Sequence, residues 1–200
     1  MMQIECFIEG VTPLLLHRAT EESLTGSTRQ NTIEEKVDPR IVAGKCVYRI
    51  GDQASGQLAL PGAAFARMVR EAGGAHKSKG SRKSLKYIVP SAVLVLDDLC
   101  GLFERDRRTP IVDFEIDSRP VTIPATKGRV MRYRARLNAW SCKVHIQLNE
   151  GIMGENILRQ LWNEGLQQIG VGDFRPEKGG PFGTSHVVSW AAVGRIKAVA

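Results

Sequence analysis

The chain has 200 residues, of which 42% are hydrophobic, and these values fit one domain that buries a substantial core. It has no run of about 18 apolar residues, and its first residues lack the basic start and apolar stretch of a secretory signal. The four cysteines are about forty residues apart without a C-x-x-C pair, which favours buried thiols over disulfides or a zinc site. We therefore expect a cytoplasmic protein with no membrane partner.

The net charge of +7 is concentrated in two stretches of the chain. Residues 61–90 hold seven lysines and arginines against one acidic residue, and residues 127–147 hold six against none. These stretches carry +12 and leave −5 for the rest of the chain. Segregated positive charge attracts a polyanion, although two solvated basic faces without a partner are the alternative. The candidate cations are Lys77, Lys79, Arg82 and Lys83 in the first stretch and Arg132, Arg134 and Arg136 in the second.

In chain order, the first predicted element is a strand over residues 2–9, where apolar and polar residues alternate. Residues 10–57 are polar and irregular, so we expect an insertion over the core in which Ile41–Ile50 forms an irregular strand. A helix is expected to open at Leu58–Gly62 and to end at Gly73. Its apolar face consists of Phe65, Met68, Val69 and Ala72.

The second half of the chain begins with an expected basic loop over residues 73–86 and a strand over residues 87–96. Residues 129–137 predict a strand with its three arginines on one face and apolar residues packed on the other. A strand over 142–148, a helix over about 154–168 that ends at Gly170, and a strand over about 184–190 follow. The order predicts a single α+β domain over residues 1–200, with a ferredoxin-like (RNA-recognition-motif-like) antiparallel sheet and two helices on one face.

A glycine-rich loop over residues 170–183 is the most informative local feature. The loop follows a helix and precedes a strand, whereas a dinucleotide-binding loop follows a strand and precedes a helix, so no nucleotide cofactor is expected. Glycines let a backbone approach a ligand closely and expose its N–H groups, although a plain connection is the alternative. We expect this loop to be mobile alone, to order on binding, and to accept side chains at two glycines with little loss of stability. The candidate ligand-contacting residues are Gly172, Phe174, Arg175, Lys178 and Gly179.

Two motifs resemble the RAMP superfamily, which includes the backbone-type subunits of CRISPR effector complexes and similar phage-encoded proteins. The segment LPGAAFARMVR over residues 60–70 resembles the I-P-G-S-S-x-K-G-x-x-R helix entry of this family. The glycine-rich loop is similar to its C-terminal glycine-rich loop, and the predicted strand order agrees with its core. The sequence departs from the family where Ala63, Ala64 and Ala66 replace the Ser, Ser and Lys/Gly positions.

The resemblance implies a non-catalytic subunit that holds the backbone of a single-stranded nucleic acid, with RNA favoured over DNA. It also implies self-association along that ligand or assembly into a multi-subunit ribonucleoprotein, in a host cytoplasm if the chain is phage-encoded. Backbone binding needs point charges and few aromatic residues, and only 6% of this chain is aromatic. The basic loop, the arginine strand and Arg175 are the residues that charge alone favours for this role.

An enzymatic function remains an open alternative. The four histidines share no metal-ligand spacing, so no metal site is expected. RAMP-type ribonucleases use a general base without a metal, and His17 after the first strand is placed for that role. Asp38 before a proline resembles a cleavage aspartate of some family members and is equally an ordinary turn residue. A protein-binding module, for example a phage-encoded inhibitor, is the third interpretation.

Overall fold

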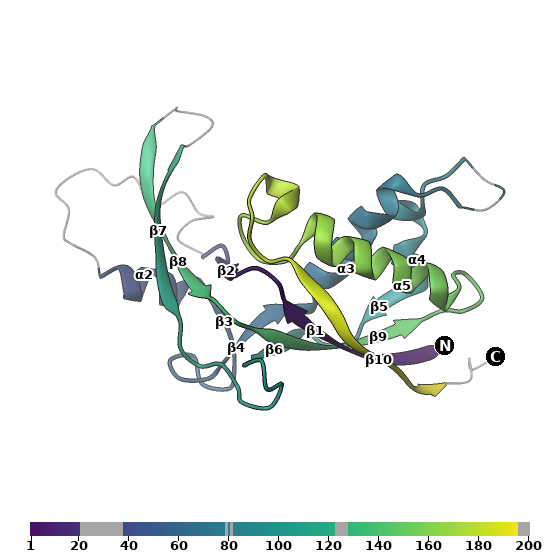
Figure 1. Ribbon diagram of the computed structural model, residues 1–200, viewed down its shortest axis with the longest axis horizontal. Coiled ribbons are helices and arrows are strands. Elements are labelled where there is room, and N and C mark those ends of the chain that lie inside the picture. The colour runs from purple at the N-terminus through teal and green to yellow at the C-terminus, as the bar shows by residue number, and fades with distance from the viewer. Residues whose placement is uncertain (21–37, 79, 81, 123–127, 196–200) are drawn as a thin grey trace.

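The computed structural model describes residues 1–20, 38–78, 80, 82–122 and 128–195, which form two sheets and a helical layer (Figure 1). The larger sheet contains seven strands, β1 (Met2–Gly10), β3 (Tyr48–Ile50), β4 (Gln57–Pro61), β5 (Val93–Val95), β6 (Leu99–Phe103), β9 (Ser141–Leu148) and β10 (Ser185–Arg195). The smaller sheet contains β2 (Leu14–Leu16), β7 (Glu115–Thr122) and β8 (Arg129–Leu137). The helices are α2 (Pro39–Lys45), α3 (Gly62–Ala72), α4 (Val89–Ala92) and α5 (Glu155–Glu164), with helical turns η1 (Gly73–Ala75), η2 (Leu85–Tyr87), η3 (Gly165–Ile169) and η4 (Pro176–Lys178).

The core of the larger sheet has the ferredoxin-like order β10-β1-β9-β5. Every pair in this row is antiparallel, and α3 and α5 occupy the two crossover positions, between β1 and β5 and between β9 and β10. The first half of β9 pairs with β6 instead, and β4 and β3 continue the sheet beyond it. The predicted α+β class and its antiparallel sheet are therefore confirmed.

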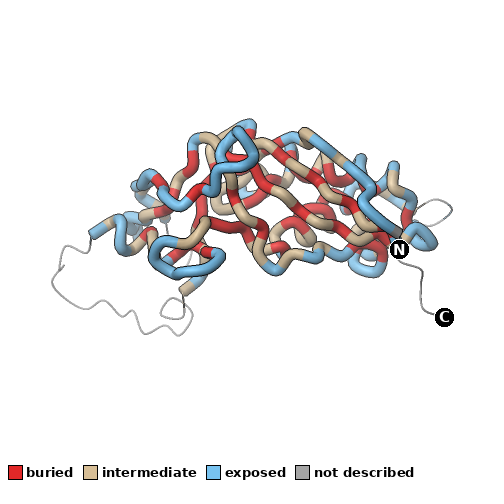
Figure 2. Tube along the Cα trace, turned by 90° about the horizontal axis from the view of Figure 1, so that it is seen from below, coloured by how far each residue is buried: buried red, intermediate tan, exposed pale blue. Residues whose placement is uncertain are grey.

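Both long helices cover the same face of this sheet (Figure 1). Residues of β1 alternate between buried and half-buried along the whole strand, and those of β9 alternate in the same way after its first residue. Figure 2 shows buried residues alternating with less buried ones along strands of the molecule. The buried residues meet the apolar stripe of α3 and α5, where Phe65 stacks on Trp162 with ring centroids 5.9 Å apart. Burying these aromatic rings stabilises the helix-on-sheet packing by several kcal/mol, at about 1.5–3 kcal/mol for each large side chain.

The smaller sheet extends sideways from the end of β1. β7 and β8 form a hairpin whose base pairs with β2, and the hairpin projects away from the larger sheet (Figure 1). Trp140, fully buried between β8 and β9, donates its indole N–H to the carbonyl of Thr12 at 2.9 Å. A Cβ on Gly10 would lie 2.2 Å from this indole, so only glycine fits beneath the tryptophan.

Several expected elements are confirmed by the structure. β1, α3, β8 and β9 cover the ranges that the periodicity predicts, and α5 continues into the π-helical turn η3 before Gly170. The four apolar residues expected on the inner face of α3 are all buried. β10 extends beyond its expected end, to Arg195.

Other expectations about secondary structure are wrong. Residues 39–45 form α2 rather than the beginning of a strand, because Asp38 caps the helix and accepts a hydrogen bond from the backbone N–H of Arg40 at 2.8 Å. Residues 57–61 form the strand β4 rather than a helix entry, and residues 85–92 form η2 and α4 before the short strand β5. β7 was not among the expected strands, and Pro120 lies within it. A proline is tolerated there because β7 is the edge strand of the described part of the smaller sheet.

Candidate nucleic-acid interface

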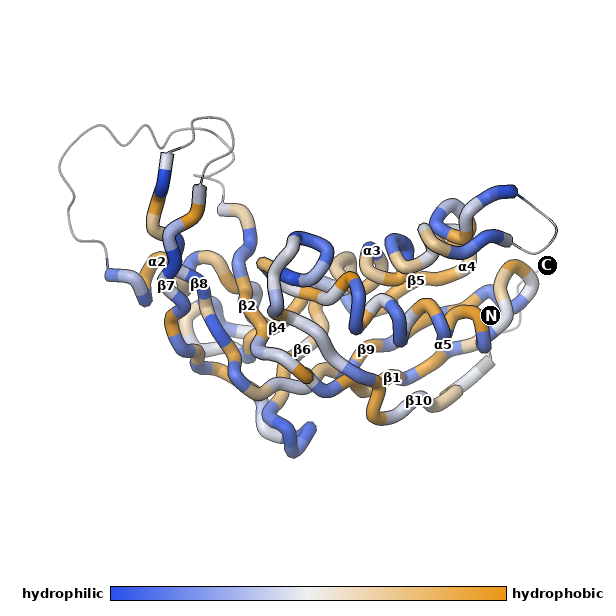
Figure 3. Tube along the Cα trace, turned by 45° about the horizontal axis from the view of Figure 1, so that its top comes forward, coloured by the Kyte–Doolittle hydropathy of each residue, from blue (hydrophilic) through white to orange (hydrophobic). Residues whose placement is uncertain are grey.

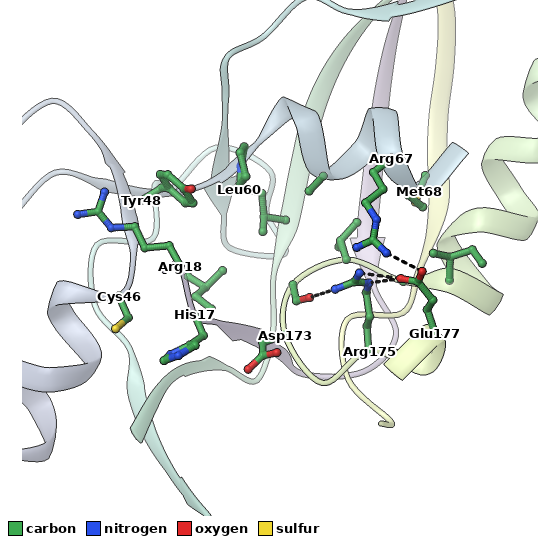
Figure 4. A pocket seen from close by; sticks show the side chains of 17 residues that line it. His17, Arg18, Cys46, Tyr48, Leu60, Arg67, Met68, Asp173, Arg175 and Glu177 are labelled. Atoms are coloured by element: carbon green, nitrogen blue, oxygen red, sulfur yellow. Dashed lines mark hydrogen bonds and ion pairs between the residues drawn. The ribbon is translucent and has the colours of Figure 1, made fainter. Parts of the chain in front are cut away.

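Three segments that are far apart in the sequence enclose a pocket of about 220 Å³ (Figure 4). The first is the end of β2 with the residues that follow it, His17 and Arg18. The second is the beginning of α3, with Ala64, Arg67 and Met68, and the third is the glycine-rich loop from Ile169 to Glu177. Cys46 and Tyr48 close the remaining side. The pocket thus joins the P-G helix entry, the glycine-rich loop and His17.

The arginine face of the hairpin lies against this loop through one buried ion pair. Arg134 Nε donates to Asp173 Oδ2 at 2.6 Å, and the Arg134 side chain is only 7% exposed. Burial alone would raise the pKa of Asp173, but the hydrogen bond and charge of Arg134 outweigh it and hold the pKa below its ordinary value. The pair therefore fixes the hairpin to the loop and leaves Arg134 enclosed.

The expectation of a uniformly cationic face opposite a packed face is therefore wrong. Arg132 is exposed and Arg136 is half-buried, with its Nε bonded to Asn138 Oδ1 at 2.8 Å. On the opposite face Ala135 is buried and Tyr133 packs partly against the core, but Met131 is 53% exposed. Packing stops halfway along the hairpin because the outer half of β8 extends past the larger sheet (Figure 1).

A second contact between hairpin and loop is made by Arg119 on β7. Its guanidinium lies over the ring of Phe182, 4.7 Å from the ring centroid, and it also pairs with the buried Asp117 at 2.8 Å. Phe182 in turn packs on Phe174, with centroids 6.1 Å apart. Phe174, a candidate for base stacking, therefore already has an aromatic neighbour within the protein.

Arg175 occupies the centre of the glycine-rich loop and is held from two sides. It donates to the carbonyl of Gly172 at 2.9 Å and to Glu177 Oε2 at 2.6 Å. The other oxygen of Glu177 accepts from Arg67 on α3 at 2.7 Å. One carboxylate thus orients two guanidinium groups at the pocket, and the cluster keeps one net positive charge (Figure 4).

His17 is uncharged near neutral pH. Burial and the positive charge of Arg132 lower its pKa from the ordinary value of 6.5, although Asp173 acts in the opposite direction. Arg132 Nη1 lies 3.4 Å from His17 Nε2, and because an arginine can only donate, Nε2 is the acceptor and Nδ1 carries the hydrogen. A neutral histidine beside a cation is the form that a general base requires.

Gly172 is needed by the protein's own chain, so the expectation that it accepts a side chain with little loss of stability is wrong. The expected mobility of the free loop and its ordering on binding stay predictions. Gly172 has a φ of +79°, and a Cβ there would lie 2.6 Å from the carbonyl oxygen of Leu15. The loop is held by backbone hydrogen bonds from Asp173 to Leu15 at 2.8 Å and from Gly183 to Pro13 at 2.9 Å. Gly179 differs, because its φ of +75° is combined with open space around it.

We expect Gly172→Ala to lower the free energy of unfolding by about 2–3 kcal/mol. The left-handed backbone costs an alanine about 1 kcal/mol, and the clash with the Leu15 carbonyl adds about 1–2 kcal/mol. Gly179→Ala is the matched control, since it carries the same backbone cost without the clash, and it should lose about 1 kcal/mol. Urea unfolding curves of both variants measure the difference. Equal losses would mean that the contact with β2 contributes nothing to stability.

The other predicted residues lie away from the pocket. Lys178 is exposed on the turn η4. The basic loop with Lys77, Arg82 and Lys83 is at the end of the molecule opposite the hairpin, and Figure 3 shows the described part of this loop as mainly hydrophilic and the hairpin as mixed. Lys79 lies outside the described residues. Asp38 caps α2, which supports its interpretation as an ordinary turn residue.

Sequence reasoning missed several residues of the interface. Their common feature is that each acts through a partner distant in the chain, for example 110 residues away for Arg67 and Glu177. Two of them carried a signal, because Arg67 lies within the P-G helix-entry motif and Arg18 follows His17, the candidate general base. The missed residues are Arg18, Tyr48, Arg67, Arg119, Asp173 and Glu177.

The fold and the site together define an α+β domain of ferredoxin-like topology with a hairpin and a glycine-rich loop around a basic pocket. No family model and no curated protein matches the chain. Among solved structures it is similar to Cmr6 from Pyrococcus furiosus, with 10% identity, a TM-score of 0.48 and coverage of 92% of this chain and 97% of that chain. It is also similar to a chain of a Type IV-B CRISPR complex, with 12% identity, a TM-score of 0.47 and coverage of 99% and 94%.

The name of the second structure is that of a CRISPR complex. At these TM-scores the likeness concerns the outline of the fold alone. Within the described residues, no helix is long and apolar enough to span a membrane. In the same part of the chain, no group of three histidine, cysteine or acidic side chains is arranged to hold a metal ion.

Proposed function

We propose that this chain binds the backbone of a single-stranded nucleic acid along a surface that runs from the β7–β8 hairpin to the glycine-rich loop. The observation that carries the proposal is that arginines from three separate segments line one pocket, and that the hairpin with its further arginines is fixed beside this pocket by the Arg134–Asp173 pair. We call this surface the arginine surface. It comprises Arg18, Arg67, Arg119, Arg132, Arg134, Arg136 and Arg175.

The arginine surface keeps a positive balance after its internal ion pairs are counted. Three carboxylates, those of Asp117, Asp173 and Glu177, form ion pairs with its seven arginines, and Glu115 stands opposite Arg136 in the strand register, which leaves +3. Arg132 is exposed, and the side chains of Arg67 and Arg119 are 42% and 40% exposed. Partly exposed guanidinium groups held by carboxylates are pre-organised for phosphate oxygens, which they bind as planar, two-pronged donors.

Several finer features of the proposal rest on the motif resemblance. We take RNA as the favoured ligand over DNA, and self-association along the strand or within a multi-subunit ribonucleoprotein as the mode of action. The basic loop at residues 73–86 lies at the opposite end from the arginine surface (Figure 1). If copies of the protein assemble along one strand, this basic loop is suited to bind the phosphates of that strand next to the neighbouring copy.

A second candidate function is a metal-independent ribonuclease centred on His17. The neutral state of this histidine and the Arg132 side chain 3.4 Å away favour it, because such a pair could accept a proton and stabilise a phosphate charge. We place it second, because in the described structure Arg132 already occupies the Nε2 lone pair of His17.

A gel assay with labelled single-stranded RNA distinguishes the candidates. We expect the protein to shift the RNA without shortening it, with or without divalent cations. Discrete products that His17→Ala abolishes would replace the binding function by the ribonuclease. Neither a shift nor cleavage at low salt would contradict both and favour a protein-binding module.

A further inference from the structure

A groove of about 450 Å³ lies between the basic loop and the beginning of α5, at the end of the molecule opposite the hairpin (Figure 1). We call it the distal groove. Three of its lining side chains, those of Leu85, Met153 and Leu161, are at most 8% exposed and form an apolar floor. Ile152 and Ile157 also line it and are 46% and 41% exposed. Aliphatic side chains that stay open to solvent around a concave surface are typical of a binding site.

The two walls of the distal groove are held in place by contacts within the protein. The base of the basic loop is a short hairpin, in which the backbone N–H of Ser78 donates to the Lys83 carbonyl and that of Leu85 to the His76 carbonyl, both at 2.9 Å. His76 Nε2 lies 2.5 Å from Glu164 Oε2, which ties this hairpin to α5. The groove therefore exists before a partner binds, and a partner gains affinity because little of the wall has to be ordered.

The charge beside the distal groove has one sign. Residues 73–86 hold five lysines and arginines and no acidic residue. Lys77 lines the groove itself, and Arg82 and Lys83 are exposed on the same loop. No acidic residue of the described chain lines the groove. A fitting partner must therefore offer apolar side chains for the floor and negative charge next to them.

A nucleic-acid strand meets only half of this requirement. Its phosphates would use the charges of the loop, but single-stranded bases are held by aromatic stacking, and no Phe, Tyr or Trp of the described residues lines the groove. An amphipathic helix meets both halves. Its apolar residues at positions i, i+3, i+4 and i+7 fill a groove, and acidic residues beside that stripe face the lysines. The groove volume lies within the range of about 300–1,000 Å³ that encloses a drug-sized ligand, so it has room for several such side chains.

We propose that the distal groove binds an acidic amphipathic helix of a partner protein. The floor of Leu85, Met153 and Leu161 would take up the apolar stripe of that helix, and the basic loop would pair with its carboxylates. This inference goes beyond the proposed function, because the groove and the arginine surface lie at opposite ends of the molecule (Figure 1). One copy of the protein could then hold a strand and a partner protein at the same time.

The test uses a fluorescein-labelled designed peptide of about 18 residues, long enough to form a helix, with leucines at the stripe positions and glutamates on either side. A second peptide has lysines in place of the glutamates. Fluorescence anisotropy at about 0.1 M salt should show that the full-length protein binds the acidic peptide at least about tenfold more tightly than the lysine peptide, because like charges repel at the loop.

Two matched pairs of variants separate the floor from the loop. Ile157→Gln should weaken binding of the acidic peptide about fivefold, whereas Leu94→Gln, at a leucine that is 57% exposed on β5 outside the groove, should leave it unchanged. Lys77→Gln/Lys83→Gln should weaken it about threefold. Arg107→Gln/Arg108→Gln removes two charges from an exposed loop elsewhere and should have no effect. Thermal unfolding shows that each variant is folded.

Four results would overturn the proposal. They are no binding of the acidic peptide at about 0.05 M salt, equal affinity for the two peptides, equal effects of Ile157→Gln and Leu94→Gln, and displacement of the peptide by a single-stranded RNA of about eight nucleotides. The last would assign the groove to nucleic acid. An oligomer in sedimentation that Ile157→Gln converts to a monomer would make a second copy the occupant instead. RNA binding at the arginine surface is measured without the peptide, so the proposed function succeeds or fails separately.

Discussion

Asp173→Ala is expected to lower the free energy of unfolding by about 3 kcal/mol, the largest stability effect that we predict. The variant leaves the Arg134 guanidinium, which is 7% exposed, without its carboxylate partner. Removing one member of a buried ion pair costs about 3–5 kcal/mol, and we take the lower end because the Asp173 side chain is 30% exposed. Urea unfolding at neutral pH measures the loss.

The control is a pair of the same residue types on the surface. Asp113→Ala removes the carboxylate paired with Arg40, where the side chains are 74% and 52% exposed, and should cost less than about 1 kcal/mol. The double variant Arg134→Met/Asp173→Ala should regain part of the loss because no unpaired buried charge remains. Equal losses for Asp173→Ala and Asp113→Ala would show that the buried pair does not anchor the hairpin.

The same pair predicts part of the acid sensitivity of the protein. Because the pKa of Asp173 is lower in the folded chain than its ordinary value of 3.8, its contribution is present above that value. The contribution disappears as the pH falls through the lowered pKa. The difference in stability between wild type and Asp173→Ala should therefore begin to shrink as the pH falls below 3.8 and disappear only below the lowered pKa of the folded chain.

Arg132→Gln/Arg136→Gln is expected to weaken binding of single-stranded RNA about 25-fold at about 0.1 M salt. Removing one phosphate contact to a single strand flattens the slope of log affinity against log salt by about 0.7, so removing two changes it by about 1.4. These two arginines are chosen because Arg134 supports the fold, and a variant that includes it would confuse stability with binding. Fluorescence anisotropy across a salt series gives both values.

The basic loop provides the matched control for charge. Lys77→Gln/Lys83→Gln removes two positive charges from the opposite end of the molecule (Figure 3). With an oligonucleotide of about eight nucleotides, inside the range of known site sizes, we expect this variant to keep nearly the full slope. A larger effect from the loop than from the hairpin would move the binding surface to residues 73–86.

Local periodicity was sufficient to predict the elements that pack on a single core. The alternation in β1 and the apolar stripe of α3 each show which face is buried, because both elements meet the core along their full length. α2 carried a helix-start signal in the Asp38-Pro39 pair, but the irregular segment around it obscured the pattern. β7 pairs with β8 despite a proline, a tolerance that depends on its place at an edge.

The candidate site was predictable only in part. Charge segregation selected Arg132 and Arg136, and the glycine-rich loop drew attention to Arg175; that these residues contact a ligand stays a prediction. The distribution of charge along the chain could not show that Arg134 is enclosed and paired with Asp173, since the two residues are 39 positions apart. The glycine-rich loop was identified correctly as a place of close approach. The neighbour of Gly172, however, is the backbone of Leu15, so its glycine serves the fold.

The proposed binding function is tested most directly by the affinity of the wild-type protein for a labelled single-stranded RNA between about 0.05 and 0.2 M salt. Six arginines of the surface are not buried, namely Arg18, Arg67, Arg119, Arg132, Arg136 and Arg175, and they predict a slope of about −4 in log affinity against log salt, at about −0.7 for each phosphate contact. No binding at the lowest salt, or a slope near zero, would contradict the arginine surface as a nucleic-acid interface.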